Sequence, residues 1–228
     1  MLNLLNKIIL SNNAVEEFYK EYYNNQKFKD WLDETIPEIE LCEKQEQNNP
    51  WHKYNVLGHI LHSVEEMNKQ TLGLGDHERK LLAYTMLFHD IGKPEKHITR
   101  EKDGKMIDSF LNHNLASERI AKQHLPTLGF NREEVEIISK LVNKHDIFMF
   151  IKDFKTKNPY WKELTEDLVK EEIEDLSTVG DGQKLMRWLV MVGRADNLAQ
   201  NEKMTAEPLA LLNKFDLILD KFEQVKDV

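Results

Sequence analysis

Histidine and aspartate residues, which can act as metal ligands, occur where a helical pattern would place apolar side chains. His145 follows Leu141 by four residues, and Asp196 follows Val192 by four, so both lie on the apolar faces of predicted helices. A carboxylate on a buried face is costly unless a cation or a metal ion pairs with it. The spacing therefore predicts a charged or metal-binding centre inside a helical fold.

Further candidates lie at helix ends or share one side of a helix. They are His59 and His62, the pair His89–Asp90, and His113. Each alone has a simpler explanation, because an inward histidine can be a hydrogen-bonded core residue and Asp196 could pair with Arg194. As a set, converging helices could direct them into one cavity, where imidazole and carboxylate suit Mn, Fe, Co, Ni or Zn.

Helices must position these side chains, because the chain is predicted to be almost entirely helical. Its 9 glycines and 6 prolines separate segments with apolar residues at i, i+3 and i+4. No segment alternates strongly enough to predict a sheet, although residues 105–110 could form a short extended piece. The opening MLNLLNKIIL is interpreted as part of a first helix, not as a cleaved leader. The other predicted helices cover residues 12–24, 27–34, 55–71, 76–91, 114–127, 131–145, 161–176, 182–201 and 206–225.

Two helix boundaries carry local signals. Gly92 is expected to adopt the left-handed conformation after the helix that ends at His89–Asp90, and Pro94 prevents that helix from continuing. Asn131 and Glu134 have the spacing of a capping box at the start of the predicted helix 131–145.

The absence of repeats and linkers predicts one all-α domain over residues 1–228, with about eight to nine helices. Its core is expected at about 45–200, between helical flanks at 1–44 and 201–228.

Composition narrows the setting and the partners. The 31 Lys and Arg residues against 40 Asp and Glu give a net charge of −9, which disfavours binding to duplex nucleic acid. A single cysteine, Cys42, excludes an internal disulfide and a cysteine-based zinc site, and is typical of a reducing cytoplasm. No apolar run approaches the roughly 18 to 20 residues of a membrane span. We therefore expect a cytoplasmic protein with no membrane partner; its oligomeric state stays open.

Four segments resemble the HD superfamily of metal-dependent phosphohydrolases, in particular the HD domain attached to bacterial tRNA nucleotidyltransferases and poly(A) polymerases. They are NNPWHKYNVLGHILHSV (48–64), LFHDIGKP (87–94), KPEKHITREKDGKMIDSFLNHNLASERIA (93–121) and GRADN (193–197). The resemblance covers roughly residues 45–200. The nucleotidyltransferase head motif is absent, so nucleotidyl transfer is not implied. The family's Gly-His-Glu is replaced here by Asn112-His113-Asn114.

The resemblance implies an HD-type helical fold with one or two divalent metal ions, for which Mn, Fe, Ni, Co and Zn are candidates and Mg an alternative. It assigns His59, His89, Asp90 and Asp196 to the first ion. It assigns His113 and His145 to a second ion, with Asp90 bridging the two.

The implied activity is hydrolysis of a nucleotide or other small phosphoester through a metal-bound hydroxide. Asp90, Lys93 and Arg194 are the proposed catalytic residues. Lys93 either pairs with substrate phosphate or is a solvated residue at a helix end. Arg194 either contacts phosphate or braces Asp196. An RNA terminus is another candidate substrate.

Several basic side chains are left with two interpretations. His62 either supports the ligands or acts as general acid, or pairs with Glu66 on a polar face. His52 and His97 are expected on the surface or in loops. The lysines either flank the entrance to the site and attract an anionic substrate, or form a solvated surface; they are Lys140, Lys144, Lys152, Lys155, Lys157 and Lys162.

Two functions compete with the enzyme. One is a non-catalytic HD module that keeps its metal for stability and binds a nucleotide or an RNA end. The other is a helical interaction protein whose histidines belong to the core, which would bind no metal.

Overall fold

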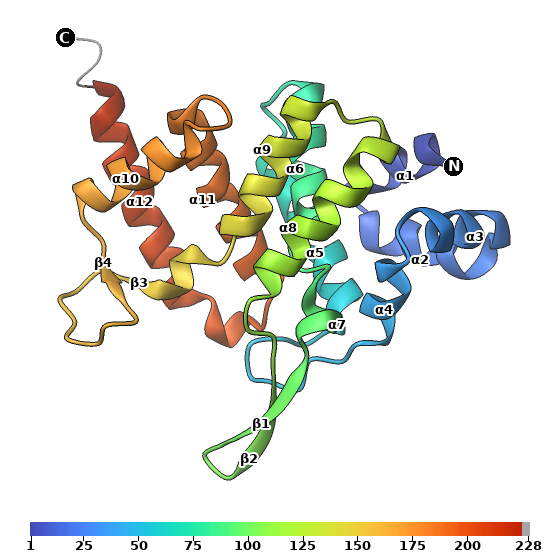
Figure 1. Cartoon of the computed structure of the whole chain (residues 1–228), viewed down its shortest axis with the longest axis horizontal. Coiled ribbons are helices and arrows are strands. Elements are labelled where there is room, and N and C mark those ends of the chain that lie inside the picture. The colour runs from blue at the N-terminus through green and yellow to red at the C-terminus, as the bar shows by residue number, and fades with distance from the viewer. Residues whose placement is uncertain (225–228) are drawn as a thin grey trace.

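The computed structural model describes residues 1–224 and consists mainly of helices (Figure 1). This confirms the all-α prediction. Most helices lie within a few residues of the predicted segments. These are α1 (Leu2–Ile9), α2 (Ala14–Asn24), α3 (Gln26–Thr35), α5 (Val56–Gln70), α6 (Asp76–Phe88), α8 (His113–His124), α9 (Arg132–Lys144), α10 (Glu166–Leu176), α11 (Gly182–Leu198) and α12 (Ala206–Gln224).

Short helices add to the expected eight or nine. The additional α-helices are α4 (Glu38–Lys44) and α7 (Lys93–Lys96), and the 3-10 helices are η1 (Leu125–Leu128), η2 (Ile147–Phe150) and η3 (Glu202–Met204). The predicted helix 206–225 is observed as far as Gln224, and residues 225–228 of the predicted flank lie outside the described residues. Within residues 1–224, no helix is both long enough and apolar enough to cross a membrane.

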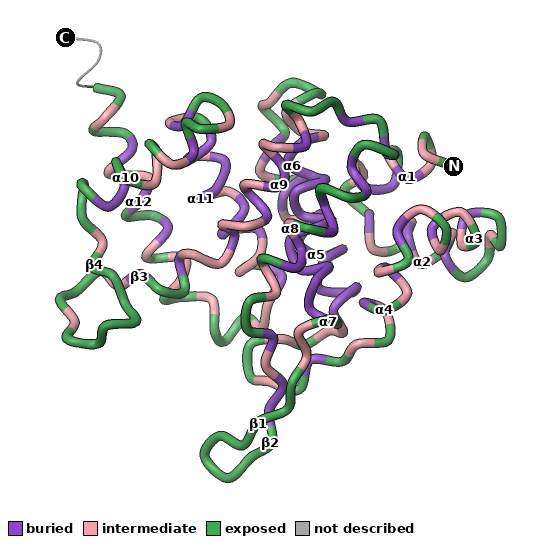
Figure 2. The backbone as a smooth tube through the Cα atoms, in the orientation of Figure 1, coloured by how far each residue is buried: buried purple, intermediate pink, exposed green. Residues whose placement is uncertain are grey.

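The hydrophobic core extends from the first helix to the last. One cluster of buried apolar side chains includes Leu5 of α1 and Leu219 of α12. Helix α5 packs against α2, α4, α6 and α11, and α8 packs against α9. Figure 2 shows that α5 and α6 are among the most continuously buried segments. Most side chains on α5 and those at the end of α6 are therefore shielded from water.

The N-terminal helices are tied to this core by hydrogen bonds as well as by apolar contacts. The side-chain amide of Asn68 donates to the backbone carbonyls of Ile9 and Ser11, at 2.9 and 2.8 Å. The Tyr84 hydroxyl donates to Asn6 Oδ1 at 2.6 Å. These bonds satisfy polar groups that burial would otherwise leave unpaired.

The expected extended piece around 105–110 is one strand of a hairpin that projects from the helical body (Figure 1). Strands β1 (Ile98–Lys102) and β2 (Lys105–Ser109) pair antiparallel. Asp103 and Gly104 join them with positive φ angles of 51° and 73°, a backbone conformation that suits a two-residue hairpin turn. A second pair, β3 (Ile151–Lys152) and β4 (Lys162–Glu163), is parallel and only two residues long.

Strand β4 also shortens the helix that was predicted from residue 161. Helix α10 begins at Glu166, because Thr165 caps it by accepting a hydrogen bond from the backbone N–H of Leu168. Of the two predicted boundary signals, the capping box of Asn131 and Glu134 is confirmed.

The expectation that Gly92 is left-handed is wrong, because its φ is −82°. Helix α6 ends at Phe88, and Pro94 lies in the first turn of α7, where its missing N–H costs nothing. Glycine is needed at position 92 because α8 passes close by. An added Cβ would lie 2.5 Å from Ser117 N and 2.7 Å from the carbonyl oxygen of His113.

Gly92→Ala is therefore expected to destabilise the protein by about 1–3 kcal/mol, the usual cost of an overpacked core site. The new methyl group must push the start of α8 away, which would also break the 2.9 Å hydrogen bond from Gly92 N–H to Ser117 Oγ. Urea unfolding measures the change. Gly73→Ala is the matched control, because nothing lies within 4 Å of its added Cβ. Equal unfolding midpoints for the two variants would contradict the prediction.

Candidate metal centre

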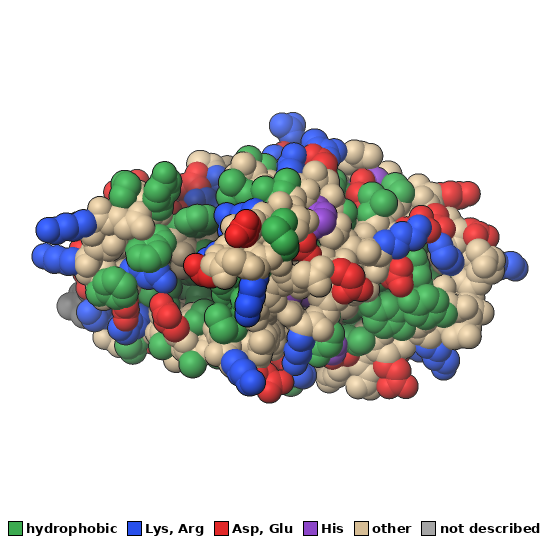
Figure 3. Space-filling view, turned by 90° about the horizontal axis from the view of Figure 1, so that it is seen from below, with side chains coloured by type: hydrophobic (Ala, Val, Ile, Leu, Met, Phe, Trp, Pro, Cys, Tyr) green, Lys and Arg blue, Asp and Glu red, His purple; other side chains and the backbone are tan. Residues whose placement is uncertain are grey.

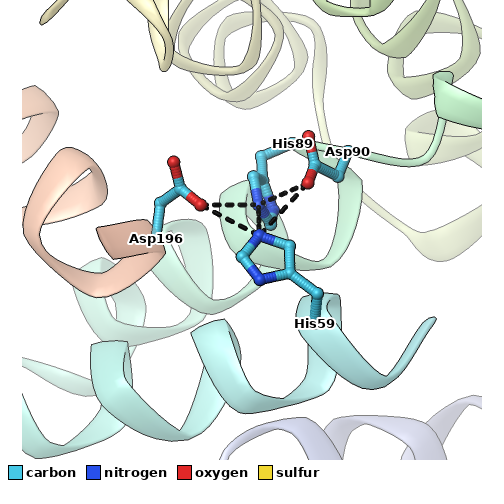
Figure 4. Close-up of side chains that lie close together, drawn as sticks. All are labelled: His59, His89, Asp90 and Asp196. Atoms are coloured by element: carbon cyan, nitrogen blue, oxygen red, sulfur yellow. Dashed lines mark hydrogen bonds and ion pairs between the residues drawn. The ribbon is translucent and has the colours of Figure 1, made fainter. Parts of the chain in front are cut away.

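Four side chains from three parts of the chain converge at the centre of the fold (Figure 4). His59 lies in the first turns of α5, which Asn55 caps by accepting a hydrogen bond from Gly58 N–H. His89 and Asp90 follow α6 directly, and Asp196 lies near the end of α11. Packing of α5 against α6 and α11 brings the three segments together.

The ligand atoms of this first group face one another at short distances. His59 Nε2 lies 2.9 Å from Asp196 Oδ1 and 3.2 Å from Asp90 Oδ2. His89 Nε2 lies 3.3 Å from His59 Nε2 and 3.4 Å from Asp90 Oδ2. The four atoms all lie within 4.8 Å of one another. Three of the residues are buried, and the Asp196 side chain is 15% exposed.

A second group shares Asp90. Its other carboxylate oxygen, Oδ1, lies 3.0 Å from His113 Nε2 and 3.5 Å from His145 Nε2. The two Nε2 atoms are 3.1 Å apart. His113 begins α8 and His145 follows the end of α9, so the close packing of these two helices forms the group. The two oxygens of Asp90 are thus divided between two sets of histidines.

Hydrogen bonds to the backbone orient three of the imidazole rings. In His89, His113 and His145, Nδ1 lies 2.7, 2.8 and 2.7 Å from the carbonyl oxygen of the residue three positions earlier. A carbonyl can only accept, so Nδ1 carries the proton and Nε2 of each neutral ring presents its lone pair to the centre. Lone pairs that face one another and a carboxylate form a set that suits a cation.

The residues present therefore fit one divalent transition-metal ion in each group. Imidazole nitrogen and carboxylate oxygen are ligands for such ions, and the first group offers four of them. Two buried atoms are also left without a well-directed hydrogen bond. They are His59 Nδ1 and Asp90 Oδ2, although the ammonium of Lys93 lies near the latter.

Without a metal ion, the carboxylates and imidazoles of the site stabilise one another's charged forms by pairing. Burial opposes ionisation of Asp90 and Asp196, but the pKa of each is well below its usual value. The charge of Lys93 lowers the pKa of Asp90, and hydrogen bonds from His59 and His89 lower that of Asp196. Burial also opposes protonation of His89, but the two carboxylates raise its pKa to about 10. In the metal-free protein, His89 therefore carries a proton at pH 7 that a metal ion must displace.

We accordingly expect metal binding at pH 7 to release protons and metal affinity to rise with pH. Because the pKa of His89 is raised, the stability gained from its protonated form is complete below the ordinary value of about 6.5. That stability is lost as the pH rises through about 10. Titration calorimetry with Mn²⁺ in two buffers of different ionisation enthalpy counts the protons. Identical heats in both buffers, with affinity independent of pH, would contradict the prediction.

Lys93 is not the solvated helix-end residue that was one of its two interpretations, because it is only 5% exposed. Its Nζ lies 2.5 Å from Asp90 Oδ2, 2.9 Å from Gln47 Oε1 and 3.0 Å from His52 Nε2. His52 is in a loop as expected, but it packs into the site, with its ring centroid 4.9 Å from that of His59. Gln47 was not predicted in the site, because an isolated glutamine carries no chemical signal, and His52 was expected outside the site.

Arg194 is directed away from the other predicted site residues. Its guanidinium donates to Asp216 at 2.6 Å and to Asn213 at 2.9 Å, both on α12. Residues two positions apart on a helix point about 200° from each other, so Arg194 and Asp196 lie on opposite sides of α11. Arg194 therefore does not brace Asp196 in this arrangement, and its contact with a phosphate stays a prediction.

Two further histidines from the sequence analysis, His62 and His97, have local partners. His62 stacks on Tyr54, with centroids 4.1 Å apart, and its Nδ1 lies 3.8 Å from Glu65 rather than beside Glu66. Burial lowers the pKa of His62. His97 lies in a loop, as expected, and its Nε2 is 2.9 Å from Asp108 Oδ1.

Most lysines of the predicted basic cluster are paired with acids. Lys140 lies 2.7 Å from Asp175 Oδ1, and Lys144 pairs with Glu172 and Asp175. Lys152 and Lys162 also have acidic neighbours, in Glu207 and Glu172. These pairs reduce the positive potential that attraction of an anionic substrate, one of the two interpretations of the cluster, would require.

Comparisons with known proteins indicate the family of this chain. A family model described as the HD domain matches residues 54–179. A similar curated protein is the bifunctional uridylyltransferase/uridylyl-removing enzyme of Nitrobacter hamburgensis, which is 29% identical over 115 residues. That match covers 43% of this chain but only 11% of the relative, so the chain corresponds to about a ninth of that protein's length.

Proposed function

We propose that this chain, which belongs to the HD domain family, is a metal-dependent phosphohydrolase that acts on a nucleotide or another small phosphoester. The observation that carries the proposal is the position of Asp90, which directs one oxygen to His59 and His89 and the other to His113 and His145. Two ions held by one carboxylate are a common arrangement in phosphoester hydrolysis.

Each group of residues has a definite task in this proposal. His59, His89, Asp90 and Asp196 would hold one ion, and Asp90, His113 and His145 would hold the second. Bound divalent ions would lower the pKa of water and offset negative charge on a phosphoryl group. The backbone carbonyls keep the imidazole lone pairs directed inward, so the ligands need little reorganisation when an ion binds.

Partial exposure of two ligands indicates where the substrate would enter. Asp196 and His113 are 15% and 12% exposed, whereas His59, His89, Asp90 and His145 are at most 3% exposed. The two exposed ligands belong to different groups. A phosphoryl group that contacts both exposed ligands would therefore reach both ions.

Charge favours a small substrate over a long polyanion. Figure 3 shows the face of the molecule that carries the β1–β2 hairpin, where acidic and basic side chains are intermixed without a broad basic area. With a net charge of −9, binding to a duplex is expected to be weak, within or below the nonspecific range of about 10⁻⁴ to 10⁻⁶ M. We expect mononucleotides, cyclic nucleotides or RNA termini to be hydrolysed in preference to internal phosphodiesters.

The proposal is tested by elemental analysis of the purified protein together with a screen of phosphoesters in the presence of Mn²⁺, Ni²⁺, Co²⁺ or Mg²⁺. The screen should include 2′,3′-cyclic nucleotides. It should also include a uridylyl ester, because a similar protein is named for uridylyl removal. Metal-dependent turnover of a small phosphoester is the expected result. Bound metal without turnover, together with tight and salt-dependent duplex binding, would favour a non-catalytic nucleic-acid-binding module instead.

A further inference from the structure

The ammonium group of Lys93 is held by three polar neighbours beside the metal centre. Its three neighbours are Asp90 Oδ2 at 2.5 Å, Gln47 Oε1 at 2.9 Å and His52 Nε2 at 3.0 Å. Two of the three N–H donors of the ammonium have neutral acceptors, Gln47 and His52, and its charge pairs with Asp90. The group therefore acts on Asp90 in this arrangement.

The two neutral acceptors are themselves oriented by hydrogen bonds. Gln47 Nε2 donates to the carbonyl of Tyr54 at 3.2 Å, which leaves Oε1 for Lys93. His52 Nδ1 lies 2.9 Å from Asn49 Oδ1, an oxygen that also accepts the backbone N–H groups of Trp51 and His52. Nδ1 therefore carries the ring proton, and the lone pair of Nε2 accepts from Lys93.

The segment that supplies these acceptors is anchored at both sides. Asn48 donates its backbone and side-chain N–H groups to Asp108 Oδ2 of β2, at 2.8 and 3.0 Å. The carbonyl of Trp51 accepts from Asn201 N–H, which follows α11, at 2.8 Å. Residues 47–52 are thus held between the hairpin and the end of α11.

From this geometry we propose that Gln47 and His52 are positioning residues, which hold the Lys93 ammonium at the edge of the site and so keep the space among the ligands free for a metal ion. If it were released from these two acceptors, the ammonium could pair with both Asp90 and Asp196. The first ion needs the same two carboxylates, so the positively charged ammonium and the metal ion would then compete for them. The inference rests on the proposed metal-dependent function, but it concerns metal affinity and not turnover.

The test is a double-mutant cycle read by titration calorimetry with Mn²⁺ on the folded protein. His52→Phe and Gln47→Leu each remove one acceptor and are expected to weaken Mn²⁺ binding by about 10- to 100-fold, as is typical when a residue supporting a ligand is lost. In a Lys93→Met background, the same substitutions should have almost no further effect. His52→Gln, which restores an acceptor, should recover part of the affinity.

His124→Phe is the matched control, because His124 is also a shielded histidine but lies 3.1 Å from Glu38 and outside both ligand groups. It should leave Mn²⁺ affinity unchanged. An undiminished loss of affinity in the Lys93→Met background would overturn the proposal. The proposal would also be overturned if Lys93→Met raised only KM for the phosphoester and His52→Phe bound Mn²⁺ with wild-type affinity.

Thermal melts identify variants that do not fold, and the Gln47→Leu cycle decides the question if His52→Phe is one of them. A cycle with the expected coupling in a protein that hydrolyses no phosphoester would refute the proposed function and leave the positioning role intact.

Discussion

Replacing Asp90 by alanine is expected to abolish phosphoester hydrolysis and to lower metal content more than the loss of any other ligand. Each ligand histidine belongs to one group, whereas Asp90 supplies one carboxylate oxygen to each of the two groups. Its loss should therefore weaken binding of both ions by more than about 10²-fold, because even a residue that only supports a ligand contributes 10- to 100-fold. Elemental analysis after gel filtration and turnover of the best phosphoester measure the two effects.

Two variants separate this effect from a general loss of structure. Asp90→Asn keeps the size of the side chain but removes its charge, so it should also lose metal while disturbing the packing less. Asp175→Ala is a control, because its carboxylate pairs with Lys140 and Lys144 and belongs to neither ligand group. If Asp90→Ala kept full metal occupancy and wild-type turnover, the assignment of the centre would be wrong.

The second large effect is expected for His145→Ala, which should lose one of two bound ions and retain the other. His145 Nε2 faces His113 and Asp90 Oδ1, and the first group does not include it. Metal content should therefore fall from two ions per chain to one. If His145 is instead a core histidine, the substitution will lower the melting temperature and leave metal content unchanged.

His124→Ala is the matched control for this prediction. His124 is similarly buried, at 6% exposed against 3% for His145, and it lies 3.1 Å from Glu38 on α4, outside both ligand groups. It should lower stability without changing metal content. Melts of all variants with a chelator present separate loss of packing from loss of metal-linked stability.

Helices could be predicted from the sequence because their signals are local. Apolar periodicity and caps such as Asn131 with Glu134 operate within a few residues. Most predicted helices were therefore confirmed with small shifts of their boundaries. The candidate ligands were found in part from the same periodicity, since His145 and Asp196 occupy apolar faces. Their division between two ions came from resemblance to the HD superfamily, and the family match now supports that resemblance.

Two expectations that were drawn from neighbouring residues in the sequence differ from the structure. Gly92 looked like a helix C-cap, but the close approach of α8 explains the glycine instead. Arg194 was grouped with Asp196 because they are neighbours in sequence, although helix geometry points them apart.

The amino-acid sequence by itself determined the helical class, most helix positions and the residue types able to bind a metal. Only the tertiary structure decided how Asp90 divides its two oxygens and why Gln47 and His52 surround Lys93. The physical reason is the range of the interactions. Periodicity and capping depend on residues a few positions apart, whereas Gln47 meets Lys93 across 46 positions, and His113 meets His145 across 32. Such contacts exist only after α5, α6, α8, α9 and α11 have packed around one core.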